Sequence, residues 1–303
     1  NLKSSQLGNL LIKNLMGIQG SLGSIVVWSE TKKGENKNSL VMKRFGSEIQ
    51  KQITYNLFNN TGVSWNPKGD TIIYSAQTGR GSEIFWQGFL PLRLRGMSIY
   101  FDEGKGSSAS WGSNGKVYFA KHAGGRNTDI YEYVVVYAGT GPSLEMSRKL
   151  TKHSSIETEP VLSPDGNKLA YISDRTGSPP IYLMDLSTKK STRLTNKGKY
   201  NTSPAWSPDS SMIAYTSVVG GKTAIFRVGA DDPLGFANQV SPKGMQAESP
   251  VWSSDGSMVA FQAKKGMDWK IYYVLSSGSS AQRLTSSVDG VNETSPSWNS
   301  GLR

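Results

Sequence analysis

The feature that most constrains the fold is an internal repeat. One unit is complete over residues 159–195, and five further units align with it on a single anchor position. Successive anchors are 44 to 51 residues apart; they are Trp65, Trp111, Leu162, Trp206, Trp252 and Trp298. This period is typical of the four-stranded blade of a β-propeller, so the repeat predicts a ring of blades.

Fixed offsets from the anchor support one shared structure for all units. Nineteen residues after the anchor, isoleucine followed by an aromatic residue occurs at Ile84, Ile130, Ile181, Ile225 and Ile271. Eleven residues before it, threonine or serine follows an aliphatic residue at Thr54, Thr151, Thr195 and Ser241. Thr285 lies thirteen before its anchor. These positions predict matching places in each blade.

Each unit reads as a twisted antiparallel meander. A short inner strand ends at the anchor, and a turn such as Ser-Pro-Asp-Gly over residues 163–166 reverses the chain. Proline fixes φ and glycine accepts positive φ in such turns. The recurring Asp165, Asp209 and Asp255 are therefore interpreted as turn residues rather than metal ligands. One blade cannot bury both faces, so blades must stack around an axis.

The two ends of the chain explain how the ring closes. Trp298 lies five residues from the C-terminus, so its blade has only an inner strand from that end. Residues 24–29, 39–42 and 52–54 have the patterns of the missing second, third and outer strands. We therefore predict an all-β, six-bladed β-propeller of four-stranded antiparallel blades over residues 22–303, with the last blade closed by N-terminal strands.

Residues 1–21 differ from the repeats. Leu7, Leu11 and Leu15 recur at helical spacing and predict a short N-terminal helix. The chain begins without methionine or a signal sequence. We expect it to be a piece of a longer protein, with residues 1–21 as a helical linker or the remnant of an N-terminal domain.

Composition excludes several classes of function. The absence of cysteine excludes disulfides and thiolate chemistry. The formal charge of +11 is spread over every segment, which argues against a nucleic-acid partner. The longest apolar run, residues 133–138, is too short for membrane insertion.

Motifs for catalysis are also lacking. The two histidines, His122 and His153, form no H-E-x-x-H motif, and no G-x-S-x-G sequence occurs. We predict no catalytic or metal-binding residue and no cofactor, although a cation in the central channel is left open.

The blade sequences resemble propeller repeats of the TolB family, of prolyl-oligopeptidase-type peptidases and of tricorn-like proteases. Residues 6–27 are similar to the passage that joins the N-terminal α/β domain of TolB proteins to their propeller, with Met16 where threonine is usual. The Ser-Pro-x-Trp ending at residues 295–298 is also similar. The resemblance covers the full chain, and these two segments favour the TolB family.

Membership of that family implies a non-catalytic, periplasmic protein-binding hub of the Tol–Pal system. The propeller would bind Pal, the peptidoglycan-associated lipoprotein, at the mouth of its channel, and colicin-like proteins can use the same place. TolA would be bound through an N-terminal domain that is largely missing here. We expect a monomer.

The resemblance also implies where Pal would be bound, in the loops between an outer strand and the next inner strand. The matching residues are Asn60, Thr61, His153, Glu157, Thr158, Glu159, Tyr200, Asn201, Thr202, Glu248, Ser249, Glu293 and Thr294. Small hydroxyl, amide and carboxylate groups offer adaptable hydrogen bonds to a partner. The same side chains can instead cap the backbone of their own loops.

Two other functions stay open. One is a hydrolase or lyase with its site in the channel, which would need a carboxylate there. The other is a carbohydrate-binding propeller attracted to anionic wall polymers by the positive charge, whose binding would weaken steeply with salt.

Overall fold

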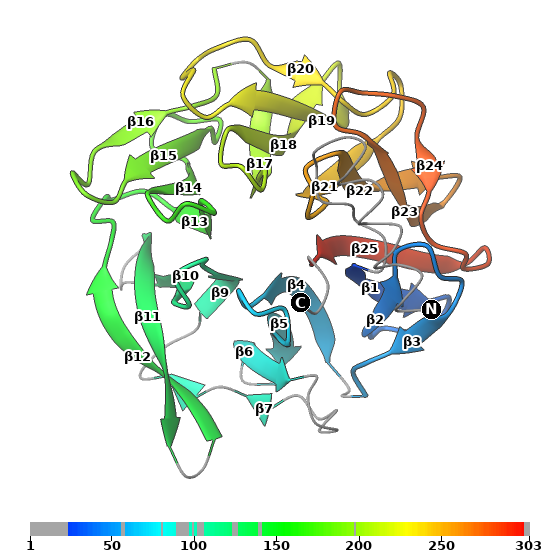
Figure 1. Cartoon of the computed structure of the whole chain (residues 1–303), viewed down its shortest axis with the longest axis horizontal. Helices are drawn as coiled ribbons and strands as arrows, with labels where there is room; N and C mark the ends of the chain where they lie inside the picture. Colours follow the sequence, from blue (N-terminus) through cyan, green and yellow to red (C-terminus); the bar gives the residue numbers. More distant parts are fainter. Residues whose placement is uncertain are drawn as a thin grey trace, which may run out of the picture.

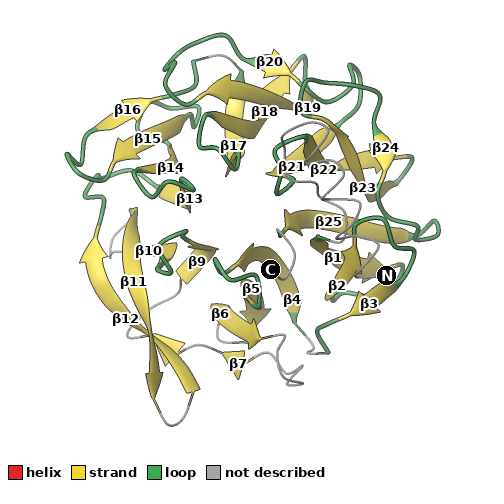
Figure 2. Cartoon of the chain, in the orientation of Figure 1, coloured by secondary structure: helices red, strands yellow, loops and turns green. Residues whose placement is uncertain are grey.

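Six β-sheets form a closed ring around a central axis (Figure 1). The structure is a computed structural model that describes residues 24–55, 58–79, 81–88, 97–98, 100–101, 106–122, 127–138, 141–196 and 198–299. Within these residues every regular element is a strand, as Figure 2 shows, and no helix is long and apolar enough to cross a membrane. The six-bladed all-β prediction is confirmed. The predicted helix at residues 1–21 lies outside the described residues.

Blades 1 to 3 follow the chain order. Blade 1 contains β4 (Asn59–Trp65), β5 (Thr71–Thr78), β6 (Gly81–Gly88) and β7 (Met97–Ser98). Blade 2 contains β8 (Tyr100–Phe101), β9 (Gly106–Trp111), β10 (Val117–His122), β11 (Thr128–Ala138) and β12 (Gly141–Lys149). Blade 3 contains β13 (Glu157–Leu162), β14 (Lys168–Ser173), β15 (Ile181–Asp185) and β16 (Ser191–Arg193).

Blades 4 to 6 complete the ring. Blade 4 contains β17 (Lys199–Trp206), β18 (Met212–Val219), β19 (Lys222–Gly229) and β20 (Asn238–Gln239). Blade 5 contains β21 (Ala247–Trp252), β22 (Met258–Lys265), β23 (Asp268–Leu275) and β24 (Gln282–Arg283). Blade 6 contains β25 (Val291–Trp298), β1 (Ile25–Lys32), β2 (Ser39–Arg44) and β3 (Gln50–Gln52).

Blade 2 departs from the common pattern. Its sheet has a fifth strand, because the short β8 pairs in parallel with β12. Its β11–β12 hairpin is also long, with strands of 11 and 9 residues. The other five blades have four antiparallel strands each, as the repeat predicts.

The anchor positions mark the ends of the inner strands. Each anchor is the last residue of its strand: Trp65 of β4, Trp111 of β9, Leu162 of β13, Trp206 of β17, Trp252 of β21 and Trp298 of β25. These side chains pack in wedges between blades. The cluster around Trp206 and Tyr215 of blade 4, for example, includes Ala170, Ile181 and Leu194 of blade 3. The apolar core is therefore divided into layers between neighbouring blades.

The predicted closure of the ring is confirmed. The C-terminal β25 pairs antiparallel with the N-terminal β1, with Val26 opposite Trp298 (Figure 1). The Trp298 indole Nε1 donates a hydrogen bond of 2.6 Å to Ser24 Oγ, and its ring lies 5.0 Å from that of Phe45. Strands from both ends of the chain thus build one blade, and no sheet edge is left open at the joint.

The recurring isoleucine and the recurring threonine or serine are joined by a hydrogen bond. The Thr195 hydroxyl accepts a hydrogen bond of 3.0 Å from the backbone N–H of Ile181, and Ser241 does the same for Ile225 at 3.0 Å. In return, Leu194 N–H donates to Ile181 O at 2.8 Å. The end of the outer strand is tied in this way to the start of the third strand.

The Ser-Pro-Asp-Gly turns have the predicted role. In the first of them, Ser163 Oγ donates to Asp165 Oδ1 at 2.5 Å and accepts from Lys168 N–H at 2.9 Å. The Ser163 hydrogen bond is the main cause that lowers the pKa of Asp165. Ser253 and Asp255 make the same contact at 2.6 Å. These aspartates are thus occupied within their own turns.

Candidate functional site

The inner strands share a bulge that surrounds the channel. Three residues before each anchor, the backbone adopts φ between +51° and +64° at Gly62, Ser108, Glu159, Ser203, Ser249 and Ser295. Five of these residues are not glycine, and a left-handed conformation is uncommon for them. Each bulge also shifts the register with the second strand. Because the bulge recurs in all six inner strands, it is a regular structural feature of the ring.

Hydrogen bonds between blades hold this bulge ring in place. Ser203 N–H donates to Glu159 Oε2 at 2.7 Å, and Ser249 N–H donates to Thr216 Oγ1 at 3.0 Å. Ser295 N–H donates to Gln262 Oε1 at 2.8 Å. In each case the acceptor belongs to the preceding blade. The next residue is proline in four of the six strands, and proline adds no N–H that would need a partner.

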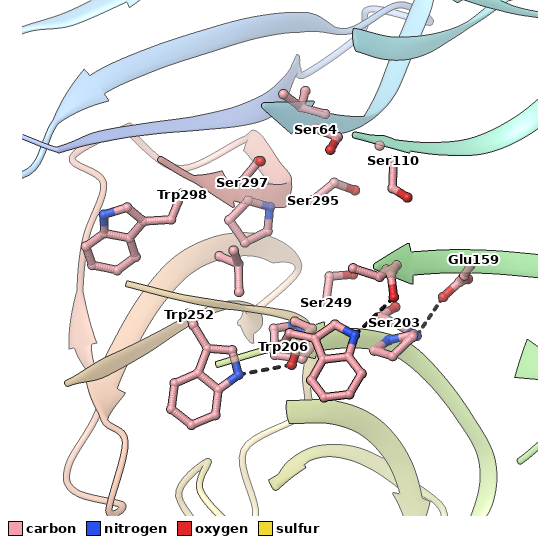
Figure 3. A pocket seen from close by; sticks show the side chains of 18 of the residues that line it. Ser64, Ser110, Glu159, Ser203, Trp206, Ser249, Trp252, Ser295, Ser297 and Trp298 are labelled. Carbon is pink, nitrogen blue, oxygen red and sulfur yellow. Dashed lines mark hydrogen bonds between the residues drawn. The ribbon is translucent and has the colours of Figure 1, made fainter. Parts of the chain in front are cut away.

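A cavity of about 680 Å³ runs along the axis from the bulge ring toward the anchors (Figure 3). Small hydroxyl side chains and prolines line it, with the anchor tryptophans Trp206, Trp252 and Trp298 behind them. Glu159 is the one ionisable residue among the described residues of this lining. The described lining therefore offers many weak hydrogen-bonding groups and a single carboxylate.

The carboxylate of Glu159 is held in an environment that disfavours its charge. Burial raises its pKa above the usual 4.5, and the hydrogen bond from Ser203 N–H only partly opposes this. The proton is therefore bound more tightly in the folded than in the unfolded protein. The charged carboxylate reduces stability once the pH rises through the folded pKa, and this loss is absent below about pH 4.5.

Replacing Glu159 with glutamine should therefore stabilise the protein at pH 7. The glutamine Oε1 can still accept the Ser203 N–H, while the cost of burying a charge is removed. Urea unfolding should show a higher midpoint for Glu159→Gln at pH 7 and equal midpoints for the two proteins near about pH 4. A variant that is less stable than the parent at pH 7 would contradict this assignment.

The residues that the sequence predicted for partner binding fall into four groups by their position in the structure. One position before the bulge lie Thr61, Thr158, Thr202, Glu248 and Thr294, here called the mouth ring. All five are exposed or half-buried. Glu159 and Ser249 belong to the bulge ring itself. A third group lies on the surface: Tyr200, 59% exposed, is near the start of β17, and His153 is in the loop before β13. His153 Nδ1 lies 2.9 Å from Ser155 Oγ.

The fourth group is buried inside the wedges. Asn60, Glu157, Asn201 and Glu293 are at most 2% exposed. Asn60 Nδ2 donates to Asn38 O at 3.0 Å, and Asn201 Nδ2 donates to Thr195 Oγ1 at 3.1 Å. Glu157 forms an ion pair with Arg175, and Glu293 accepts from Ile271 N–H at 3.3 Å. These four side chains therefore make contacts within and between the blades, whereas the mouth ring residues are exposed or half-buried.

Sequence reasoning missed the bulge as a feature of the inner strands, and with it Gly62 and Ser108. A signal was present, because proline stands two positions before four of the anchors. Proline inside a strand marks an edge or a bulge. Its repeated place could have located the ring of small residues around the channel.

Comparison with known proteins agrees with this geometry. Residues 127–300 match the family model described as the TolB beta propeller domain. A curated relative, the protein TolB homolog of Chlorobium luteolum, is 30% identical over 180 residues, which cover 59% of this chain and 38% of the relative. The chain thus spans less than half the length of that curated relative.

Solved structures share the fold at lower identity. The crystal structure of TolB from Acinetobacter baumannii superposes with a TM-score of 0.79 at 21% identity, covering 97% of this chain and 71% of that one. Hydrazine synthase of Kuenenia stuttgartiensis gives a TM-score of 0.72 at 13% identity, covering 95% of this chain and 48% of that one. These likenesses concern the fold, which proteins of different function share.

Proposed function

The chain belongs to the TolB β-propeller family, and from this premise we propose that it is a non-catalytic protein-binding hub of a Tol–Pal envelope system. The partner that we propose is the lipoprotein Pal, bound at the mouth ring. The observation that carries the proposal is the ring of accessible hydroxyl and carboxylate groups on strands that the bulge ring fixes in place. A rigid surface of small polar groups favours hydrogen bonding to a protein partner at low entropic cost.

The rest of the proposal follows from family membership. We place the protein in the periplasm, as a monomer, and expect TolA to be bound through a preceding domain and colicin-like proteins to compete with Pal. The absence of catalysis is proposed because Glu159 is the single carboxylate among the described lining of the channel. Glycoside hydrolysis, for example, commonly requires a pair of carboxyl groups.

Calorimetric titration with the Pal domain of the same organism tests the proposal. We expect saturable binding with one Pal per chain, and no detectable heat at high micromolar concentration would rule it out. The titration should be repeated at low and high salt, because attraction by the +11 charge alone would weaken steeply with salt. A parallel assay with peptides and oligosaccharides tests for catalysis, and turnover abolished by Glu159→Gln would reject the non-catalytic assignment.

A further inference from the structure

Blades 3 and 4 differ at one equivalent position in the wedges between blades. In blade 3, the guanidinium of Arg175 lies over the Tyr182 ring, 4.3 Å from its centroid. Its Nη2 donates to Tyr171 Oη at 2.9 Å, and its Nε donates to Ser173 Oγ at 2.9 Å. Glu157 completes the surroundings as the ion-pair partner. The arginine thus contacts three oxygen-bearing side chains and covers an aromatic face. The second carboxylate oxygen of Glu157, Oε2, makes no hydrogen bond among the described residues.

Blade 4 repeats these surroundings without the arginine. Tyr215 pairs with Phe226 across β18 and β19, as Tyr171 pairs with Tyr182 across β14 and β15. The two ring pairs have similar separations, 6.1 Å and 5.8 Å. Ser217 and Asn201 stand where blade 3 has Ser173 and Glu157, counted from the anchors Trp206 and Leu162. Val219 takes the place of Arg175 in the sequence.

Among the described residues, the atoms that take the places of the arginine-facing oxygens of blade 3 lack partners in blade 4. Ser217 Oγ and Asn201 Oδ1 are buried without a hydrogen bond in this part of the chain, and each residue is 2% exposed. The Tyr215 hydroxyl makes no hydrogen bond within the described part of the chain, and burial alone raises its pKa to about 12. Unpartnered buried acceptors are rare in native proteins and call for a ligand or a bridging group.

A cavity adjoins these groups. Its volume is about 910 Å³, enough for an arginine side chain with flanking backbone, and Tyr215, Ser217, Val219 and Phe226 contribute to its lining. It lies at the β18–β19 hairpin, on the face of blade 4 that packs against blade 3. Asn201 Oδ1 lies beneath Gly198, which also lines the cavity.

Blade 2 shows that this aromatic position accepts cations more generally. Its counterpart of Phe226 is Tyr131, and the ammonium groups of Lys121 and Lys149 lie 5.9 Å and 5.6 Å from the centroid of that ring. Among the described residues, no cation of the chain lies over Phe226. The described part of blade 4 therefore has the aromatic face and the acceptors, and holds no cation over that face.

We propose that this blade 4 cavity binds a guanidinium group, supplied by an arginine side chain of a peptide or by a small guanidino compound. Guanidinium is planar, carries only donors and stacks on aromatic rings, which matches the Tyr215 and Ser217 hydroxyl groups and the Phe226 face of the lining, with Asn201 Oδ1 behind Gly198. Asparagine replaces the carboxylate of Glu157, so attraction is weaker than in blade 3 and the ligand exchanges. The expected dissociation constant for a single capped arginine is about 1 mM.

The test is an NMR titration of the whole chain with N-acetyl-L-arginine methylamide. We expect saturable shifts of the Gly198, Gly220 and Gly221 amide signals, and no such shifts with the norleucine analogue, which lacks the guanidinium. Methylguanidine and an arginine tripeptide in parallel arms show whether a small compound or a peptide binds better. Absence of shifts with every guanidinium probe, or equal shifts with norleucine, would overturn the proposal.

Two variants locate the site. Val219→Arg supplies the missing guanidinium from the chain and should abolish binding. Phe226→Leu keeps an apolar side chain but removes the ring face, and it should weaken binding about 2- to 30-fold. Unchanged affinity in both variants would place the ligand elsewhere and reject the site.

A third variant tests whether a lysine of the chain itself occupies the site. Lys197 and Lys199 flank Gly198 in the sequence. If the ligand binds only after both are replaced by serine, the chain fills the site itself, and the proposal of an external ligand is wrong. Binding of equal strength in the parent and in the double variant supports it.

Discussion

Replacing Trp298 with alanine should lower the free energy of unfolding by about 3–5 kcal/mol, as is usual for a buried tryptophan. Trp298 is 8% exposed and packs with Val26, Trp28 and Leu284 in the wedge between blades 5 and 6. The substitution leaves a cavity at the joint between the two ends of the chain and removes the hydrogen bond to Ser24. Urea unfolding followed by circular dichroism measures the change.

Met267→Ala is a suitable control for this measurement. Met267 is 88% exposed and lies at the β22–β23 hairpin of blade 5, so its loss should change stability by less than about 0.5 kcal/mol. If Trp298→Ala were as mild as this control, the joint between β25 and β1 would contribute little to the ring.

Replacing Arg175 with alanine should cost about 3 kcal/mol. The substitution leaves the Glu157 carboxylate, which is fully buried, without its cationic partner, and an uncompensated buried charge is strongly destabilising. It also exposes the faces of Tyr171 and Tyr182. Thermal and urea unfolding at pH 7 should both show the loss.

A second ion pair, between Lys168 of the same blade and Asp231 of blade 4, serves as the matched control. Lys168 pairs with Asp231, whose side chain is 86% exposed, and such surface pairs contribute about 0–1 kcal/mol. Lys168→Ala should therefore be nearly neutral. If Arg175→Ala and Lys168→Ala lowered the free energy of unfolding by similar amounts, Glu157 would not be held as a buried charge that depends on Arg175.

Much of the fold could be predicted because the repeat encodes it at fixed distances. The anchors end the inner strands, and the isoleucine and threonine or serine positions meet in a hydrogen bond in blades 2, 3 and 4. The closure by both ends followed from counting strands. The fifth strand of blade 2 was not predictable, because β8 has only two residues and lies between blades in the sequence.

The candidate site was harder to predict because of the bulges. Glu157 and Thr158 are adjacent in the sequence, yet the first is fully buried and the second is half-buried. Successive side chains of a strand point to opposite faces of the sheet, and a bulge interrupts this alternation. The sequence prediction placed all of these residues in loops of one kind, so it grouped mouth ring residues with side chains that are buried in the wedges. The blade 4 cavity required contacts of Arg175 that only the structure supplies.

The most direct test of the proposed function compares the two ends of the channel in Pal titrations. Thr158→Lys places a long cation in the mouth ring, while Asn167→Lys places the same group on an exposed turn beyond the anchor of the same blade. We predict that Thr158→Lys weakens Pal binding at least about tenfold, or 1.4 kcal/mol, and that Asn167→Lys leaves it unchanged. Loss of binding in Asn167→Lys with full binding in Thr158→Lys would contradict the mouth ring as the Pal site.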